Sequence, residues 1–241
     1  MIKKINYDYI NNNKRTLVLL HGWGLDKSIY DRLVHFFCNK YSVLAIDFPG
    51  FGKSEAPSDY YDTYEYAYQI FLLLKKLDID EVCLVGHSFG GRVSIILSSM
   101  FDINIKGMVL TSCAGFNKFS LLKTIKIYKY KLCKKLHEKG YLKKWNSNRH
   151  GSSDYIKLDD NMKRVFVRVV NQDLGCLLRR IKTNLYLMWD KNDDATPYWI
   201  CKKIQRCVKV NEIIITKKCG HFTAFSNTNK FINLCLKCLG K

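Results

Sequence analysis

Residues 82–91 read Val-Cys-Leu-Val-Gly-His-Ser-Phe-Gly-Gly, an apolar run that ends in a serine flanked by small residues. A buried strand that ends in this way and continues into a helix forms a nucleophile elbow, the sharp turn that exposes a reactive serine. Gly86 and Gly90 let the strand and helix backbones pass closely, and the helix start directs free N–H groups toward Ser88. The helix itself is predicted from the apolar spacing of Val93, Ile96, Leu97 and Met100.

A serine hydroxyl is a weak nucleophile, so it needs a base that a third group orients. In a nucleophile-elbow protein the order along the chain is serine, acid, histidine. Of the six histidines, His221 lies well beyond Ser88, after the apolar run at 213–215 and before a predicted C-terminal helix. We therefore predict that His221 is the base. His35, His137 and His150 are interpreted as solvated loop residues.

The orienting acid is expected at the end of the strand that precedes the histidine strand. Residues 185–189 are a continuous apolar run, and Asp190, Asp193 and Asp194 follow it closely. Asp194 could also cap a helix that begins near Pro197. The residue pattern by itself leaves the three carboxylates in competition.

Four ordered segments resemble the α/β-hydrolase fold superfamily: His-Gly-Trp-Gly at 21–24, Asp-Phe-Pro-Gly-Phe-Gly-Lys-Ser at 47–54, the elbow, and Trp-Asp-Lys-Asn-Asp at 189–193. The resemblance covers about residues 15–115 and 183–225. It implies that Asp193 is the orienting acid and that Asp190 stands where glycine is usual. It also implies that the backbone N–H groups of Trp23 and Phe89 form an oxyanion hole, with His21 as a structural residue beneath that loop.

The length of 241 residues fits one domain with a sizeable core. Apolar strands that alternate with helical patterns predict an α/β architecture, a mostly parallel sheet flanked by helices, as in the α/β-hydrolase fold. We expect the core at 1–116 and 183–241. Residues 2–10 and 17–20 are predicted to form an N-terminal hairpin, with the asparagine run at 11–13 as its turn.

Residues 117–182 are predicted to be a helical lid inserted into that core. Two apolar stripes at helical spacing lie on either side of a polar loop at 146–154. We expect both helices to roof an apolar pocket. The stripes consist of Leu122, Ile125, Tyr128, Leu132 and Leu136, and of Met162, Val165, Phe166, Val169 and Val170.

The ten cysteines are scattered. Cys235 and Cys238 have the spacing of a redox or metal pair, but no second pair matches it, so we interpret them as structural thiols in a reducing compartment. No metal or cofactor is expected. The N-terminal residues lack a leader pattern and no apolar run is long enough to span a bilayer, which favours a cytoplasmic protein.

The formal net charge is +19, and residues 117–182 contribute 18 basic against 5 acidic side chains. A basic surface can bind nucleic acid, an anionic membrane or an acidic protein. The sequence contains no nucleic-acid-binding motif, so no nucleic-acid partner is expected. A solvated helical face is the simplest interpretation of this charge.

The function predicted from these residues is a serine hydrolase that cleaves a carboxylic ester through an acyl-enzyme. The His-Gly-Trp-Gly-Leu spelling and the compact lid resemble the pimeloyl-carrier-protein methyl ester esterases. That resemblance implies a small acyl substrate, with carriage on an acidic protein as one option. The alternatives are a carbon–carbon bond hydrolase or an aminopeptidase of the same fold, and a non-catalytic ligand-binding relative.

Overall fold

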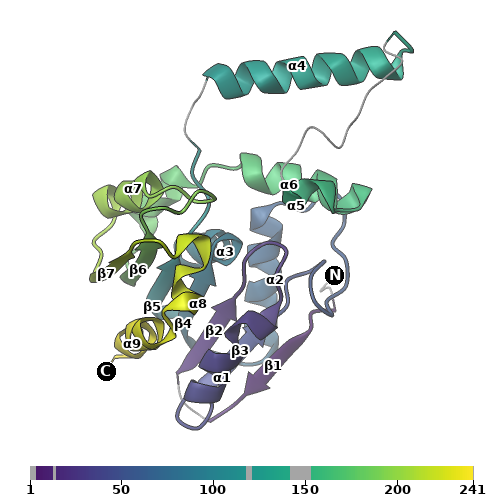
Figure 1. The fold of residues 1–241 in the computed structure, drawn as a ribbon. Coiled ribbons are helices and arrows are strands. Elements are labelled where there is room, and N and C mark those ends of the chain that lie inside the picture. Colours follow the sequence, from purple (N-terminus) through teal and green to yellow (C-terminus); the bar gives the residue numbers. More distant parts are fainter. Residues whose placement is uncertain (1–3, 13–14, 118–120, 142–152, 241) are drawn as a thin grey trace.

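The computed structural model describes residues 4–12, 15–117, 121–141 and 153–240. Within them, seven strands form one sheet in the order β1-β3-β2-β4-β5-β6-β7 (Figure 1). Only β1 is antiparallel to its neighbour, so the prediction of a mostly parallel sheet is confirmed. The strands are β1 (Tyr7–Ile10), β2 (Thr16–Leu20), β3 (Ser42–Ile46), β4 (Glu81–His87), β5 (Asn104–Thr111), β6 (Asn184–Asp190) and β7 (Glu212–Thr216).

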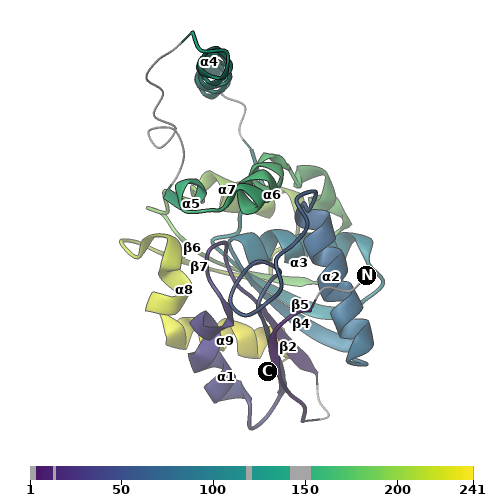
Figure 2. The same cartoon turned by 90° about the vertical axis from the view of Figure 1, so that its right-hand side faces the viewer.

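Helices cover both faces of the sheet, because neighbouring strand residues point to opposite sides (Figure 2). Leu17 and Leu19 of β2 pack in one apolar cluster, whereas Val18 and Leu20 pack in the other. The first cluster includes α1 (Asp31–Phe37), which follows the short helix η1 (Lys27–Tyr30), together with α8 (Thr223–Ser226) and α9 (Thr228–Cys238). The second includes α2 (Thr63–Lys76), α3 (Phe89–Met100) and α7 (Trp199–Cys207).

The predicted N-terminal hairpin is wrong. β1 pairs antiparallel with β3, with Tyr7 opposite Ile46, because both edges of β2 are occupied by its parallel neighbours β3 and β4. The chain after β1 crosses the start of β3 instead of turning back. Asn12 fixes that crossing, since its backbone N–H donates to Ser42 Oγ at 2.9 Å and its side chain donates to the Tyr41 carbonyl at 3.0 Å.

Residues between β5 and β6 form α4 (Leu121–Glu138), α5 (Ser153–Ile156), α6 (Asp160–Asn171) and the short helix η3 (Gly175–Arg180). The two predicted stripes lie on α4 and α6. Helix α6 packs on the body of the protein through Met162, Val165 and Val169, whereas no described side chain of α4 joins the core. Helix α4 stands apart from the sheet in both views (Figures 1 and 2). Of the predicted loop at 146–154, residues 146–152 lie outside the described residues, and Ser153 and Asp154 are the start of α5.

No helix in the described part of the chain is long and apolar enough to cross a membrane.

The junction between β4 and α3 is packed at backbone contact. A Cβ on Gly86 would lie 2.6 Å from the Gly90 carbonyl oxygen, and a Cβ on Gly90 would overlap the Leu20 carbonyl oxygen of β2. Both of these contacts are with backbone, so a side chain at either position cannot be accommodated by a rotamer change. The elbow therefore requires glycine on both sides of the serine.

Gly90→Ala should lower the free energy of unfolding by roughly 2 kcal/mol or more, because overpacking against rigid backbone is strongly destabilising. Urea denaturation followed by circular dichroism measures this. Ser98→Ala, on the same helix and half-buried, is the control and should change stability little. Equal stability of the two variants would contradict this account of the junction.

Candidate active site

Ser88 occupies the turn between β4 and α3 in a conformation that L-residues rarely adopt. Its φ is 50° and its ψ is −107°. Its N–H donates to the Thr111 carbonyl at 3.0 Å, and its carbonyl accepts from the N–H groups of Gly91 and Ala114, both at 3.1 Å. Strained backbone persists where the surroundings hold it, and such positions concentrate at functional sites.

His221 lies in the short helix η4 (Gly220–Phe222), just after β7. Its Nδ1 is 3.1 Å from Asp193 Oδ1 and 3.0 Å from Asp193 Oδ2. The Asp193 side chain is fully buried, whereas that of His221 is 21% exposed. Because Nδ1 donates to the carboxylate, the neutral imidazole carries its lone pair on Nε2. The structure thus brings His221 and Asp193 together, 28 positions apart in the chain.

Thr196 is a member of this group that the sequence analysis missed. Its N–H donates to Asp193 Oδ1 at 2.8 Å, and its hydroxyl lies 2.8 Å from Asp193 Oδ2 and 3.0 Å from the Ser112 carbonyl. Asp-x-x-Thr is a local arrangement in which a carboxylate accepts a backbone N–H three residues later. That spacing was the available signal in the sequence.

The buried Asp193 carboxylate stays ionised. Burial alone would raise its pKa, but the hydrogen bonds from His221 and from the Thr196 N–H outweigh burial and lower that pKa below the ordinary aspartate value. Asp193 therefore presents a negative charge to Nδ1 at neutral pH.

The other two aspartates of the segment lie elsewhere. Asp190 is fully buried at the end of β6; its Oδ2 accepts from Thr216 Oγ1 at 2.6 Å and from the Cys219 N–H at 2.9 Å. It therefore binds the loop that carries His221 and not the imidazole itself. Asp194 is exposed and does not cap a helix, since the N-cap residue of α7 is Tyr198.

The pKa of Asp190 is also lowered. Burial opposes this, and the hydrogen bonds from Thr216, Cys219 and Asn192 outweigh burial. The Asp190 carboxylate is thus a structural anchor for the histidine loop.

The loop after β2 lies against the serine turn. A Cβ on Gly22 would be 3.4 Å from Ser88 Cβ, so the two segments are in contact. The Trp23 ring packs edge-on against Phe89, with ring centroids 5.3 Å apart, and against Phe51 of the 47–54 loop at 4.9 Å. Both predicted oxyanion residues therefore flank Ser88.

His21 lies beneath this loop. It is buried, its Nε2 accepts from the Phe48 N–H at 3.0 Å, and its Nδ1 donates to the Gly22 carbonyl at 2.7 Å. Burial lowers its pKa to about 4. With both ring nitrogens occupied, His21 has a structural role, as expected.

His87, which precedes the serine, is a second residue that the sequence analysis did not single out. Its ring is buried, with its centroid 4.9 Å from that of His221. Burial and the neighbouring His221 lower its pKa to about 3, so it stays neutral beside the site. Its Nδ1 is 3.1 Å from Thr111 Oγ1.

Ser88 and His221 open into one cavity of about 710 Å³. Within the described residues, no acidic side chain lines it, and no hydrogen bond joins the Ser88 hydroxyl to His221. Such catalytic contacts are often long before substrate binds. The apolar lining includes Trp23, Phe89, Phe116, Phe166, Val169, Val170, Trp199, Ile200 and Phe222, and Arg92 also lines the cavity.

Helix α6 supplies the roof of this cavity. Phe166, Val169 and Val170 belong to it, and Phe166 also contacts the Trp23 ring at 5.1 Å. Arg92 of α3 fastens this roof, because its guanidinium donates to the carbonyls of Val169 at 2.7 Å and Gln172 at 3.1 Å. The second predicted stripe thus covers the site.

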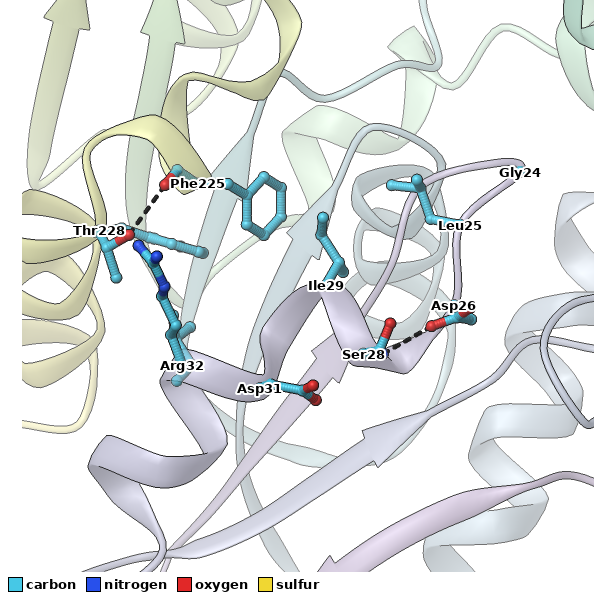
Figure 3. Close-up of a pocket in the computed structure, with 11 residues that line it drawn as sticks. Gly24, Leu25, Asp26, Ser28, Ile29, Asp31, Arg32, Phe225 and Thr228 are labelled. Carbon is cyan, nitrogen blue, oxygen red and sulfur yellow. Dashed lines mark hydrogen bonds between the residues drawn. The ribbon is translucent and has the colours of Figure 1, made fainter.

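A second cavity of about 580 Å³ lies on the other side of the loop at Gly24 and Leu25 (Figure 3). Arg32 of α1 and Phe225 of α8 also line it. Neither Ser88 nor His221 reaches it, so it is adjacent to the site but carries none of its chemical groups.

The cysteines take no part in the site. Cys235 and Cys238 are buried free thiols on α9, and the Cys83 thiol donates to the Cys238 carbonyl at 3.1 Å. Burial raises the pKa of Cys235. Within the described residues, no cluster of three or more histidine, cysteine or acidic side chains is suited to hold a metal ion.

Asp190→Asn should lower the free energy of unfolding near neutral pH by about 1–3 kcal/mol, because an amide NH₂ would face groups that donate hydrogen bonds. The folded-state pKa of Asp190 is lowered, so its contribution is full above the ordinary carboxyl pKa of about 3.9 and is lost on acidification below it. The stability gap to wild type should therefore narrow as the pH falls.

Urea denaturation at neutral and acidic pH measures this gap. Asp194→Asn, at an exposed neighbouring position, is the control and should behave like wild type at both. A gap that widens on acidification would contradict the anchoring role of Asp190.

Comparison with known proteins agrees with this architecture. A family model described as alpha/beta hydrolase fold matches residues 15–128. The uncharacterized hydrolase YugF of Bacillus subtilis is 29% identical over 46% of this chain and 41% of its own length. The AB hydrolase superfamily protein YisY of the same species is 21% identical over 91% of this chain and 90% of its own. The karrikin insensitive 2 receptor IA of Petunia hybrida is 32% identical over 40% of this chain and 36% of its own length.

Solved structures agree over nearly the whole chain. MGS-M2, an alpha/beta hydrolase enzyme from a deep-sea metagenome library, superposes with a TM-score of 0.79 at 20% identity, covering 99% of this chain and 95% of its own. The esterase EaEST of Exiguobacterium antarcticum superposes with a TM-score of 0.76 at 18% identity, covering 99% of this chain and 96% of its own. The sequence matches to YugF and to the karrikin insensitive 2 receptor IA cover less than half the length of either protein. The match at residues 15–128 and the superpositions together show that this chain has the α/β-hydrolase fold.

Proposed function

We propose that the protein is a serine hydrolase that cleaves a small carboxylic ester, with Ser88 as nucleophile, His221 as base and Asp193 as the orienting acid. The observation that carries this proposal is the Asp193–His221 pair at 3.0 Å, in a cavity that also exposes Ser88 on its strained turn. A nucleophile, a base and an orienter in this arrangement are the parts that acyl transfer requires.

The reaction begins when His221 Nε2 removes the Ser88 hydroxyl proton and Ser88 Oγ attacks the acyl carbon. The backbone N–H groups of Phe89 and Trp23 stabilise the oxyanion that develops on the carbonyl oxygen. His221 then protonates the departing alkoxide, which leaves an acyl-enzyme on Ser88. Water, deprotonated by His221, attacks that acyl-enzyme and releases the acid and free Ser88.

The environment of each group favours its role. Asp193 is ionised and buried, so it stabilises the imidazolium that forms at His221 and fixes its tautomer. Ser88 precedes the first turn of α3, where free N–H groups and the helix dipole favour negative charge.

The cavity favours a neutral, largely apolar acyl group. Its volume is in the range that holds small ligands, and aromatic and aliphatic side chains dominate its wall. An aminopeptidase would need a carboxylate to bind the substrate's ammonium group, and no acidic residue in the described part of the chain lines the cavity. The relatives reported above lend no support to a carrier-borne substrate, so we propose a small-molecule ester.

Ser88→Ala should abolish turnover of p-nitrophenyl esters, because loss of a triad serine costs on the order of 10⁶ in rate. Hydrolysis is followed at 405 nm over a series of acyl lengths, and circular dichroism checks the fold. The proposal fails if the folded variant keeps activity within tenfold of wild type.

Asp193→Asn should lower kcat by a factor on the order of 10⁴, because an asparagine amide stabilises the wrong imidazole tautomer. Asp194→Asn, at the exposed neighbouring position, is the matched control and should retain wild-type kcat. Steady-state kinetics on the best ester of the series compares them. Similar rates for the two variants would remove Asp193 from the proposed role.

A further inference from the structure

Helix α4 carries a charge that the proposed chemistry does not use. Its 18 residues contain six lysines and a single acidic residue, Glu138, and the helix stands apart from the sheet on the side of α6 (Figures 1 and 2). Among the α4 residues whose side chains are described, none lines either cavity beside the catalytic loops. The proposed ester site therefore does not explain why α4 is rich in lysine.

The same helix exposes large apolar side chains. Ile125, Tyr128 and Leu132 are 43%, 70% and 46% exposed. They are three and four positions apart, so they lie along one face of the helix. A stripe of this kind is normally buried against the core, as the corresponding stripe of α6 is. On α4 it faces solvent.

Exposed lysines accompany this stripe. Lys129, Lys131 and Lys135 are all solvent-exposed, and Tyr141 beyond the helix is 75% exposed. Apolar and aromatic side chains combined with several lysines on one helix are the features of helices that lie in a membrane interface. Tyrosine in particular suits the boundary between headgroups and acyl chains.

We infer that α4 binds the surface of an anionic lipid bilayer. Ile125, Tyr128 and Leu132 enter the boundary between headgroups and acyl chains, while the lysines neutralise anionic headgroups. A partner that offers only negative charge, such as an acidic protein or a nucleic acid, would use the lysines and leave the apolar stripe in water. The apolar stripe is thus the feature that favours a lipid surface.

This inference does not depend on ester hydrolysis. It predicts where the protein docks, and docking through α4 would turn the side of the molecule that carries α6 and the roofed cavity toward the lipid (Figure 1). The Ser88→Ala protein should therefore bind vesicles as well as wild type does.

Flotation with phosphatidylglycerol/phosphatidylcholine vesicles, compared with phosphatidylcholine alone, tests the proposal. Each lysine near an anionic surface contributes about 1 kcal/mol, or about fivefold in partitioning. The triple variant Lys129→Glu, Lys131→Glu and Lys135→Glu should therefore lose at least about tenfold in binding to anionic vesicles. The second triple variant, Ile125→Gln, Tyr128→Gln and Leu132→Gln, keeps the charge and the helix propensity and should lose binding as well.

The matched control reverses the same number of charges on the opposite side of the molecule. Lys40, Lys76 and Lys209 are exposed and precede β3, β4 and β7, so they lie toward the amino ends of the strands, away from α6. Their triple glutamate variant should bind vesicles close to wild-type level. Circular dichroism confirms that each variant is folded.

Several results would overturn the inference. The wild type could fail to float with anionic vesicles, or the control and the α4 lysine variant could lose vesicle binding equally. The glutamine variant could also bind these vesicles as well as wild type does. Salt-sensitive binding to polyglutamate without vesicle binding would also overturn it and would assign α4 to an acidic protein.

Discussion

The backbone contact between β4 and α3 is the constraint on which the site depends. Gly86 and Gly90 allow the two elements to meet with no space between them, and Ser88 is thereby held with a φ of 50°. The turn presents the serine at the carboxyl edge of the sheet. Since all strands except β1 run parallel to their neighbours, the loops after β2, β6 and β7 reach the same edge. The loop at Trp23, the Asp193 segment and His221 converge there for that reason.

Asp190 and Asp193, two buried aspartates three positions apart, have different roles at this edge. Asp193 faces the imidazole, whereas Asp190 accepts hydrogen bonds from the loop on which that imidazole is carried. Burial would raise the pKa of both carboxylates, but the hydrogen-bond donors around them outweigh it, so both pKa values are lowered. One carboxylate thus orients the histidine directly, and the other fixes the backbone that presents it.

Much of this arrangement could be predicted from the sequence because the decisive contacts are local. The elbow needs glycines at fixed spacing, and each apolar run near Ser88, Asp193 and His221 ends in a polar loop. The mostly parallel sheet is predicted because apolar strands alternate with helical patterns along the chain. The choice among Asp190, Asp193 and Asp194 depended on the superfamily resemblance, since the three are almost equivalent in local pattern.

Other features depend on tertiary contacts that local pattern does not encode. The partner of β1 is decided by which strand edges remain free, and β2 has none. Asp190 accepts hydrogen bonds from Thr216 and Cys219, which lie 26 and 29 residues further along the chain. The stripes of α4 and α6 have the same helical spacing. Met162, Val165 and Val169 of α6 are nevertheless buried in the core, whereas Ile125, Tyr128 and Leu132 of α4 are exposed. Periodicity identifies an apolar face but not the surface that covers it.

The most direct test of the central claim is covalent labelling of the native protein by a fluorophosphonate, followed by intact mass and peptide mapping. A fluorophosphonate reacts with a serine only when a base and an oxyanion site activate it. We expect a single adduct on the peptide that contains Ser88, and none in the Ser88→Ala variant. An unlabelled folded protein, or an adduct on another residue such as Ser112, would contradict it.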